Sequence, residues 1–313
     1  MSDTPNMQTS KSQNRERRES TGPTIGIVIP THNRPESTVE AIRSVIGQLL
    51  DGDRLVVVDN GSTDSTPEWA RAAGAEVIFE TQRGPGAARN AGVAHLDTDW
   101  VTFLDSDDLG DDSWLCSLRN KISSARDAGI VFSSVKYKNS GKIINPENHG
   151  IFFQNMCSNF LCSSYAVRRS IFIAAGGFDT GLRFGENTEL GIRLAAAVVS
   201  AQLRGVTLQH VTALIRDGAS VRTSRNEQLI LDALEITIAK HYALFDKDRQ
   251  TLVSYLNFAG VVATRLGFRA RALGHFTHAT FQRPTSKTLA RAVSSALFFD
   301  AYRAFLVRRR QEQ

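Results

Sequence analysis

The chain has 313 residues, of which 42% are hydrophobic, and its formal net charge is +5. This length can bury one large core or two modest ones. No run approaches the roughly 18 apolar residues of a membrane-spanning helix. The three cysteines form no CxxC pair, which excludes a disulfide scaffold and favours a reducing cytosol. The polar residues 1–23 lack the apolar stretch of a signal peptide, so we expect a disordered tail.

The next part of the chain alternates strand patterns with helix patterns. Apolar, β-branched runs at residues 24–30, 54–59, 75–80 and 100–105 predict buried strands, and the segments between them have helical spacing and helix-capping residues. This alternation predicts right-handed βαβ units. We therefore expect an α/β fold with a largely parallel sheet and helices on both of its faces.

Polar clusters follow three of the predicted strands. They are "PTHNR" at residues 30–34, "DNGSTD" at residues 59–64 and "DSDD" at residues 105–108. Ligands of such sheets bind at the carboxyl ends of the strands. The three clusters should therefore converge on one binding edge.

The cluster "FLDSDD" places the carboxylates of Asp105, Asp107 and Asp108 within four residues. One interpretation is a solvated helix start, because Asp is stabilised near a helix N-terminus. The other is a Mg²⁺ or Mn²⁺ ion, which one or two carboxylates and substrate phosphates hold together. The position beside two other polar strand ends favours the metal and a diphosphate.

Five motifs in order then carry a resemblance to a known family: "IVIPTHNR", "VVVDNGSTDST", "GPGAARNAGV", "WVTFLDSDD" and "GGFD…GENTELGIRL". Between residues 24 and 222 the chain resembles the nucleotide-sugar glycosyltransferases of the GT-A fold, of the inverting family 2 type. The resemblance implies a Rossmann-like catalytic domain over residues 24–223. A basic helical region over residues 224–313 would follow it.

The resemblance also implies roles for individual residues. Asp59 would accept a hydrogen bond from an N–H group of the nucleotide's base. Asp107 would bind the metal, Mn²⁺ or Mg²⁺. Asp105, with Ser106, would face the ribose or the donor sugar. Further nucleotide contacts are implied at Pro30, Thr31, His32, Arg34, Arg89 and Asn90.

The expected base catalyst departs from the family pattern. The family presents an Asp that takes the proton of the acceptor hydroxyl, and this chain has Asn187 there. Three alternatives stay open: Glu186 takes the role, Glu189 takes it, or the protein is a weak or regulatory relative. We favour Glu186, although both acids could simply stabilise a helix N-terminus.

A second departure concerns the metal. The family often supplies a His ligand in a turn that "LIRDGASVR" matches, and Asp217 stands in the place of that His. Asp is an oxygen ligand suited to Mg²⁺ or Mn²⁺, so we assign Asp217 to the metal site. His210, upstream, is interpreted as a strand residue.

From Glu227 onward the pattern is helical and then increasingly basic. The last helix, with Leu297, Phe298, Phe299, Tyr302, Phe305 and Leu306 and a basic end at residues 308–310, is either docked on the protein or attached to a membrane surface. No nucleic-acid-binding module is evident.

Together these features predict a metal-dependent, inverting hexosyltransferase in polysaccharide biosynthesis at the cell envelope. It would move a sugar from a nucleotide diphosphate to a hydroxyl of a glycan or lipid-linked acceptor. We expect it in the cytoplasm, either away from membranes or at the inner face of the cell membrane through peripheral contact of its basic C-terminal helices. The alternative is an inactive nucleotide-sugar-binding scaffold for another transferase.

Overall fold

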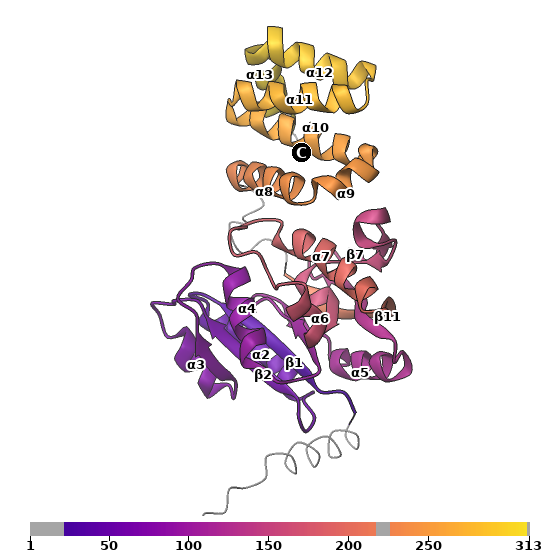
Figure 1. Cartoon of the computed structure of the whole chain (residues 1–313). Coiled ribbons are helices and arrows are strands. Elements are labelled where there is room, and N and C mark those ends of the chain that lie inside the picture. The colour runs from indigo at the N-terminus through magenta and orange to yellow at the C-terminus, as the bar shows by residue number, and fades with distance from the viewer. Residues whose placement is uncertain (1–21, 217–225, 312–313) are drawn as a thin grey trace, which may run out of the picture. The chain divides into compact units, whose positions relative to one another are not determined.

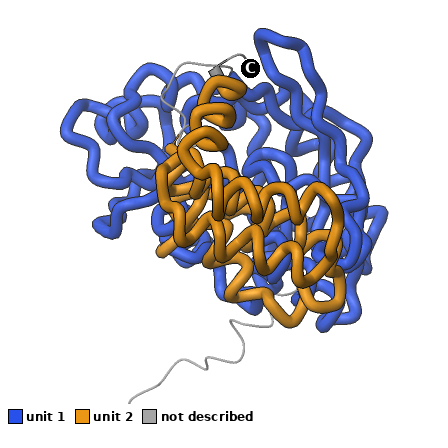
Figure 2. Tube along the Cα trace, turned by 90° about the horizontal axis from the view of Figure 1, so that it is seen from above, with its two compact units in different colours: residues 1–180, 190–219 blue, residues 181–189, 220–313 orange. Residues whose placement is uncertain are grey.

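The computed structural model describes residues 22–216 and 226–311. The chain divides into two compact units (Figure 2): residues 1–180 with 190–219, and residues 181–189 with 220–313. The predicted tail, residues 1–23, lies almost wholly outside the described residues. The predicted boundary near residue 223 stays a prediction, and the inclusion of residues 181–189 in the second unit was not anticipated.

The first unit contains a sheet of nine strands, in the order β3-β2-β1-β4-β10-β6-β11-β5, with β7 paired to β6. The strands β1, β2, β3 and β4 are parallel neighbours, whereas β10 and β5 are antiparallel to the strands beside them. The strands are β1 Ile25–Thr31, β2 Arg54–Asp59, β3 Glu76–Phe79, β4 Trp100–Phe103, β5 Leu109–Gly110, β6 Ala128–Tyr137, β7 Ile143–Ile144, β10 Tyr165–Arg168 and β11 Arg204–Ile215. A separate pair joins β8 Glu147–Asn148 to β9 Cys157–Ser158. This is the mixed sheet of a GT-A fold, with the predicted parallel strands in its first half.

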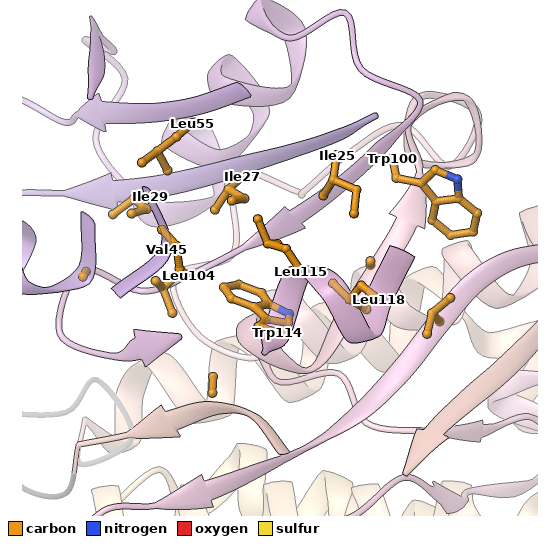
Figure 3. Packing of buried hydrophobic residues seen from close by; sticks show 14 of the residues in the cluster. Ile25, Ile27, Ile29, Val45, Leu55, Trp100, Leu104, Trp114, Leu115 and Leu118 are labelled. Atoms are coloured by element: carbon orange, nitrogen blue, oxygen red, sulfur yellow. The ribbon is translucent and has the colours of Figure 1, made fainter. Parts of the chain in front are cut away.

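The sheet has a hydrophobic core on each face because its strands are buried on both sides. The alternating side chains Ile25, Ile27 and Ile29 of β1 pack on one face (Figure 3), with Trp114 and Leu115 among their neighbours. The intervening Val28 points to the opposite face, with Val56 and Val58. The near-continuous apolar runs of the sequence therefore reflect double-sided burial.

Helices cover both faces, as predicted. α2 (Pro35–Ile46), α3 (Thr66–Ala72) and α5 (Trp114–Ser124) contribute to the first core, and α4 (Pro85–His95), α6 (Arg169–Ala174) and the later part of α7 (Glu186–Ser200) contribute to the second. Gly92 allows α4 to lie directly on β1, since a Cβ atom there would be 2.4 Å from Cγ1 of Val28. This close approach fixes the position of α4 on the sheet.

The second unit is a stack of helices (Figure 1), in which α12 and α13 lie at the end furthest from α8. The helices are α8 Glu227–Lys240, α9 Tyr242–Lys247, α10 Arg249–Leu266, α11 Arg269–Gln282, α12 Ser286–Leu297 and α13 Phe299–Gln311. Their core joins Leu231, Val262, Phe276 and Phe299. The expectation of one continuous last helix was wrong, because the chain breaks at Phe298 and α13 then packs Phe299 inward.

Candidate active site

The carboxyl ends of β1 and β2 lie side by side and their loops are tied together. Thr31 pairs with Asp59 in the sheet register. Asn33, which has a left-handed backbone with φ of 51°, accepts a hydrogen bond of 2.8 Å from the amide of Thr63 and donates its own amide to the hydroxyl of Ser62 at 2.9 Å. Two of the three predicted polar clusters therefore form one joined surface.

Asp59 is buried at the end of β2 and accepts a hydrogen bond of 3.1 Å from the amide of Ser62. The neighbouring Asn60 organises the loop before α4. Its amide group donates to the carbonyl of Gln82 at 2.8 Å, and its Oδ1 accepts from the amide of Gly84 at 2.7 Å. Asp59 is thus held on a rigid strand end.

The residues at and just after the end of β1 differ in how exposed they are. Pro30 and Thr31 are buried within the sheet, and the Thr31 hydroxyl lies 2.7 Å from that of Thr38 in α2. His32 is exposed, and its Nδ1 lies 3.2 Å from a guanidinium nitrogen of Arg83. Arg83 also donates to the carbonyl of Asn60 at 2.7 Å. His32 and Arg83 therefore present polar groups at the surface of the candidate site, while Pro30 and Thr31 belong to the buried sheet beneath it.

Arg89 of α4 is buried and reaches the aspartate cluster. Its guanidinium lies 2.6 Å from Oδ1 of Asp105 and stacks over the ring of Phe178, with 5.3 Å between its central carbon and the ring centroid. Asn90 holds that Phe in place, donating to its carbonyl at 2.9 Å and accepting from its amide at 2.8 Å. Asn90 thus acts on backbone atoms of the "GGF" turn, and Arg89 connects that turn to Asp105.

Asp107 forms a second ion pair, at 2.7 Å, with Arg34 from the loop after β1. Both side chains are about one third exposed, at 36% for Arg34 and 34% for Asp107. Ser106, between the two acids, is buried. The carboxylates of Asp105 and Asp107 therefore each have an arginine partner and remain open to a ligand.

Asp108, the third acid, is buried and accepts a hydrogen bond of 3.0 Å from the amide of Arg216. Burial, together with the charges of Asp105 and Asp107, raises the pKa of Asp108 to about 8, although the hydrogen bond opposes this. The repulsion between the like charges in "DSDD" is thus relieved in two ways: two acids face arginines, and the raised pKa of the third favours its neutral form. Asp108 also fastens the turn to the end of β11.

The predicted base candidates belong to the second unit and begin α7. Glu186 is half-buried. Glu189 is fully buried, and its Oε1 accepts from Lys240 at 2.9 Å and from His241 at 3.1 Å. Glu189 is therefore committed to an ion pair with the end of α8. Asp217, the second predicted metal ligand, lies outside the described residues, and His210 lies in β11 as expected.

The donor set at the aspartate cluster fits a hard divalent cation. Carboxylate oxygens are the ligands that Mg²⁺ and Mn²⁺ prefer, and such ions commonly use one or two carboxylates together with substrate phosphates. Asp107 offers a partly exposed carboxylate of this kind. Over residues 22–216 and 226–311, no three His, Cys, Asp or Glu side chains are grouped as a complete metal site. The arrangement fits an ion that is shared with a bound diphosphate.

Sequence analysis missed the roles of Asn33 and Asn60. The left-handed backbone of Asn33 and the several bonds of Asn60 depend on loops distant in sequence. The only local signal was their position directly after apolar strands. Asn also tolerates left-handed geometry better than most residues.

Comparison with known proteins identifies the family. Residues 26–178 match the model of glycosyl transferase family 2. This segment contains β1, β4, α4 and the aspartate cluster, and it belongs to that family. The sheet has the GT-A fold. Glucosyl-3-phosphoglycerate synthase of Mycobacterium tuberculosis is 40% identical over 96 residues, which are 28% of this chain and 29% of that protein.

An uncharacterized glycosyltransferase of Rickettsia conorii is 29% identical over 139 residues, 42% of this chain and 22% of the relative. The chain thus spans under a third of the length of these curated relatives.

Among solved structures, Staphylococcus aureus TarS 1–349 in complex with UDP-GlcNAc has a TM-score of 0.57 at 14% identity, covering 93% of this chain and 92% of that one. The mycobacterial synthase with Mn²⁺, UDP and glucosyl-3-phosphoglycerate has a TM-score of 0.52 at 18% identity, covering 76% and 86%. At these identities the structures establish the fold. None of the described helices is both long and apolar enough to cross a membrane.

Proposed function

We propose that this protein transfers a sugar from a nucleotide diphosphate donor to a hydroxyl group of a cell-envelope glycan or lipid-linked acceptor, with inversion at the anomeric carbon. The observation that carries the proposal is the pairing of Asp105 with Arg89 and of Asp107 with Arg34, at the sheet edge that also holds Asp59. Because the acceptor would belong to the cell envelope, we place the reaction at the inner face of the cell membrane. The C-terminal helices would contact that membrane peripherally.

The donor site follows from the polarity of this edge. Asp59, fixed on a buried strand end, supplies an acceptor for the N–H group of a uracil-like base. Arg34, His32 and Arg83 provide donors for the ribose and phosphates nearby. TarS and the mycobacterial synthase, whose structures contain UDP-GlcNAc and UDP, support a uridine nucleotide as the first donor to test.

Asp107, and Asp217 beyond the described residues, would hold Mn²⁺ or Mg²⁺. When bound, such an ion supplies positive charge that offsets the developing charge of the leaving diphosphate. Asp105 and Ser106 would orient the donor sugar, with Arg89 fixing the Asp105 carboxylate. Arg34, which pairs with Asp107, would add positive charge beside the phosphates.

Transfer with inversion requires a base on the acceptor side. The acceptor oxygen attacks the anomeric carbon from the face opposite the diphosphate, the bond from that carbon to the diphosphate oxygen breaks, and its electron pair leaves with the diphosphate. The hydroxyl proton passes to the base. We assign this role to Glu186, because Glu189 is buried and accepts from Lys240 and His241. A base of this kind contributes a factor of about 10²–10⁴.

The test is a screen of nucleotide sugars with Mn²⁺ or Mg²⁺, measuring donor hydrolysis and transfer for the wild type, Asp107→Ala and Glu186→Gln. Asp112→Ala, which removes an exposed acid between β5 and α5, is the matched control. We expect metal-dependent turnover in the wild type and the control. Both active-site variants should lose it, and Glu186→Gln should still bind the nucleotide.

A second candidate is a nucleotide-sugar-binding scaffold without turnover, which Asn187 favours because an amide cannot accept the acceptor's proton. Calorimetric titration with nucleoside diphosphates and metal separates the two. Metal-dependent binding without hydrolysis or transfer, for every donor and with envelope extracts as acceptor, would favour the scaffold. Absence of nucleotide binding would contradict both candidates.

A further inference from the structure

Helix α12 has its amphipathic pattern reversed. The side chains that it buries are small or hydroxylated: Thr288, Ala292 and Ser295. Its large apolar side chains are exposed instead, with Leu289 at 56%, Val293 at 42% and Leu297 at 70%. A helix normally packs its large apolar side chains inward. The exposed apolar face of α12 is therefore a candidate contact surface for a partner outside the described core.

The exposed side chains form one continuous stripe. Leu289, Val293 and Leu297 are spaced by four residues, which places them within an arc of about 80° along the helix. Phe298, directly after the helix, is 62% exposed and extends the apolar surface at its end. We call these four residues the α12 stripe. α12 lies at the far end of the stack from α8 (Figure 1), and the exposed fractions of these side chains show that the described helices leave the stripe open.

The segment that carries the stripe is rich in positive charge. Residues 283–310 contain seven Lys or Arg residues and a single acid, Asp300. Arg310 is paired with Glu227, but Arg283, Lys287, Arg308 and Arg309 form no ion pair with any residue in the described ranges. A second copy of this chain would bring the same excess charge against it. The complementary surface is therefore apolar and anionic.

We propose that the α12 stripe and its basic flanks bind the surface of an anionic lipid bilayer. An apolar helix face with Lys and Arg on its flanks lies in the headgroup region, where apolar side chains enter the acyl boundary and the cations meet lipid phosphates. This inference deepens the peripheral membrane contact of the proposed function and names the surface that makes it. It assigns the contact to α12 and its flanks, whereas sequence analysis left the last helix as either docked on the protein or attached to a membrane surface.

The experiment is co-sedimentation of the full chain with vesicles of phosphatidylcholine alone, and of phosphatidylcholine mixed with phosphatidylglycerol. We expect binding to the anionic vesicles that weakens with salt. Leu289→Ser combined with Leu297→Ser should weaken it about tenfold, and Arg283→Gln combined with Lys287→Gln by about fivefold for each charge removed. These four side chains are exposed, so the variants should unfold at the wild-type urea concentration.

Matched controls come from the first unit. Leu50 and Ile173 are 57% and 54% exposed, and Leu50→Ser with Ile173→Ser should leave vesicle binding unchanged. Arg126→Gln with Lys138→Gln removes two exposed charges and should also have little effect.

Three results would overturn the proposal. One is the absence of binding to anionic vesicles, and another is binding that survives the Leu289→Ser, Leu297→Ser change. The third is a wild-type dimer in sedimentation equilibrium that the same change dissociates, because a second copy would then cover the stripe. The vesicle assay needs neither donor nor acceptor, so its failure is distinct from a failure of sugar transfer.

Discussion

Arg89 and Asp105 form a salt bridge of 2.6 Å that joins α4 to the turn after β4. The two partners differ in exposure, since the guanidinium is 5% exposed and the carboxylate 38%. The arginine is therefore the buried support, and the aspartate is the group presented to a ligand. Stacking of Arg89 on Phe178 limits its rotation further.

Replacing Asp105 with Asn should destabilise the first unit. The change removes the carboxylate that faces a buried guanidinium, and such a loss costs about 1–3 kcal/mol. Urea unfolding followed by circular dichroism measures the difference, with Asp112→Asn as an exposed control that should change little. Equal unfolding midpoints for Asp105→Asn and the wild type would show that the bridge adds nothing to stability.

Replacing Gly92 with Ala should also destabilise the protein. The new Cβ atom would meet Cγ1 of Val28 at 2.4 Å, so α4 would have to move away from β1. Overpacking of this kind typically costs about 1–3 kcal/mol. Because Arg89 lies one turn earlier on α4, nucleoside diphosphate affinity should fall as well.

Gly274 provides the matched control for Gly92. It also lies within a helix, α11, but a Cβ atom there would have no neighbour within 4 Å. Gly274→Ala should therefore raise stability by about 0.5–1 kcal/mol, through the better helix propensity of Ala. If both substitutions shifted the thermal midpoint in the same direction, the close contact of α4 with β1 could not be the cause.

We expect Glu189 to contribute mainly to the stability of the fold. Its buried carboxylate accepts hydrogen bonds from Lys240 and His241 within the second unit. Glu189→Gln should lower the free energy of unfolding by about 1–3 kcal/mol, because Lys240 then faces a neutral amide instead of a carboxylate. Glu186→Gln should instead lower kcat by about 10²–10⁴ with little change in unfolding. A Glu189→Gln protein as stable as the wild type but inactive would transfer the role of the base to Glu189.

The stability of the second unit should depend on pH through Glu235. Burial opposes ionisation, but hydrogen bonds from Arg271 at 2.5 Å and His275 at 2.7 Å outweigh it and lower the pKa of Glu235 below its usual 4.5. An acid with a lowered pKa in the folded state contributes stability above its unfolded pKa and loses it as the pH falls through the folded value.

The difference in unfolding free energy between wild type and Glu235→Gln should therefore be about 1 kcal/mol at neutral pH, as expected for an ion pair whose side chains are about one third exposed. It should vanish in acid, below the folded pKa. Urea titrations of both proteins over this range give the measurement. A difference that stayed constant down to strongly acidic pH would show that the charge of Glu235 is not responsible.

Several features of the fold could be predicted from the sequence because they depend on local residue patterns. The strands β1, β2 and β4 follow continuous β-branched runs, and α2 and α4 begin at a proline near their first turn. The grouping of the strand ends at one edge follows from parallel pairing alone. The approximate location of the candidate site was thus accessible before any coordinates.

The tertiary structure decided which partner each polar group has and which face each helix turns inward. The pairing of Arg89 with Asp105, the burial of Asp108 and the burial of Glu189 depend on residues distant in sequence, and so they have no local signature. The orientation of α12 has the same origin. Large apolar side chains of a helix normally face inward, but the core of the second unit accommodates only the small side chains of α12. Local periodicity determines where elements form, whereas the choice of partner is set by the packing of the whole chain.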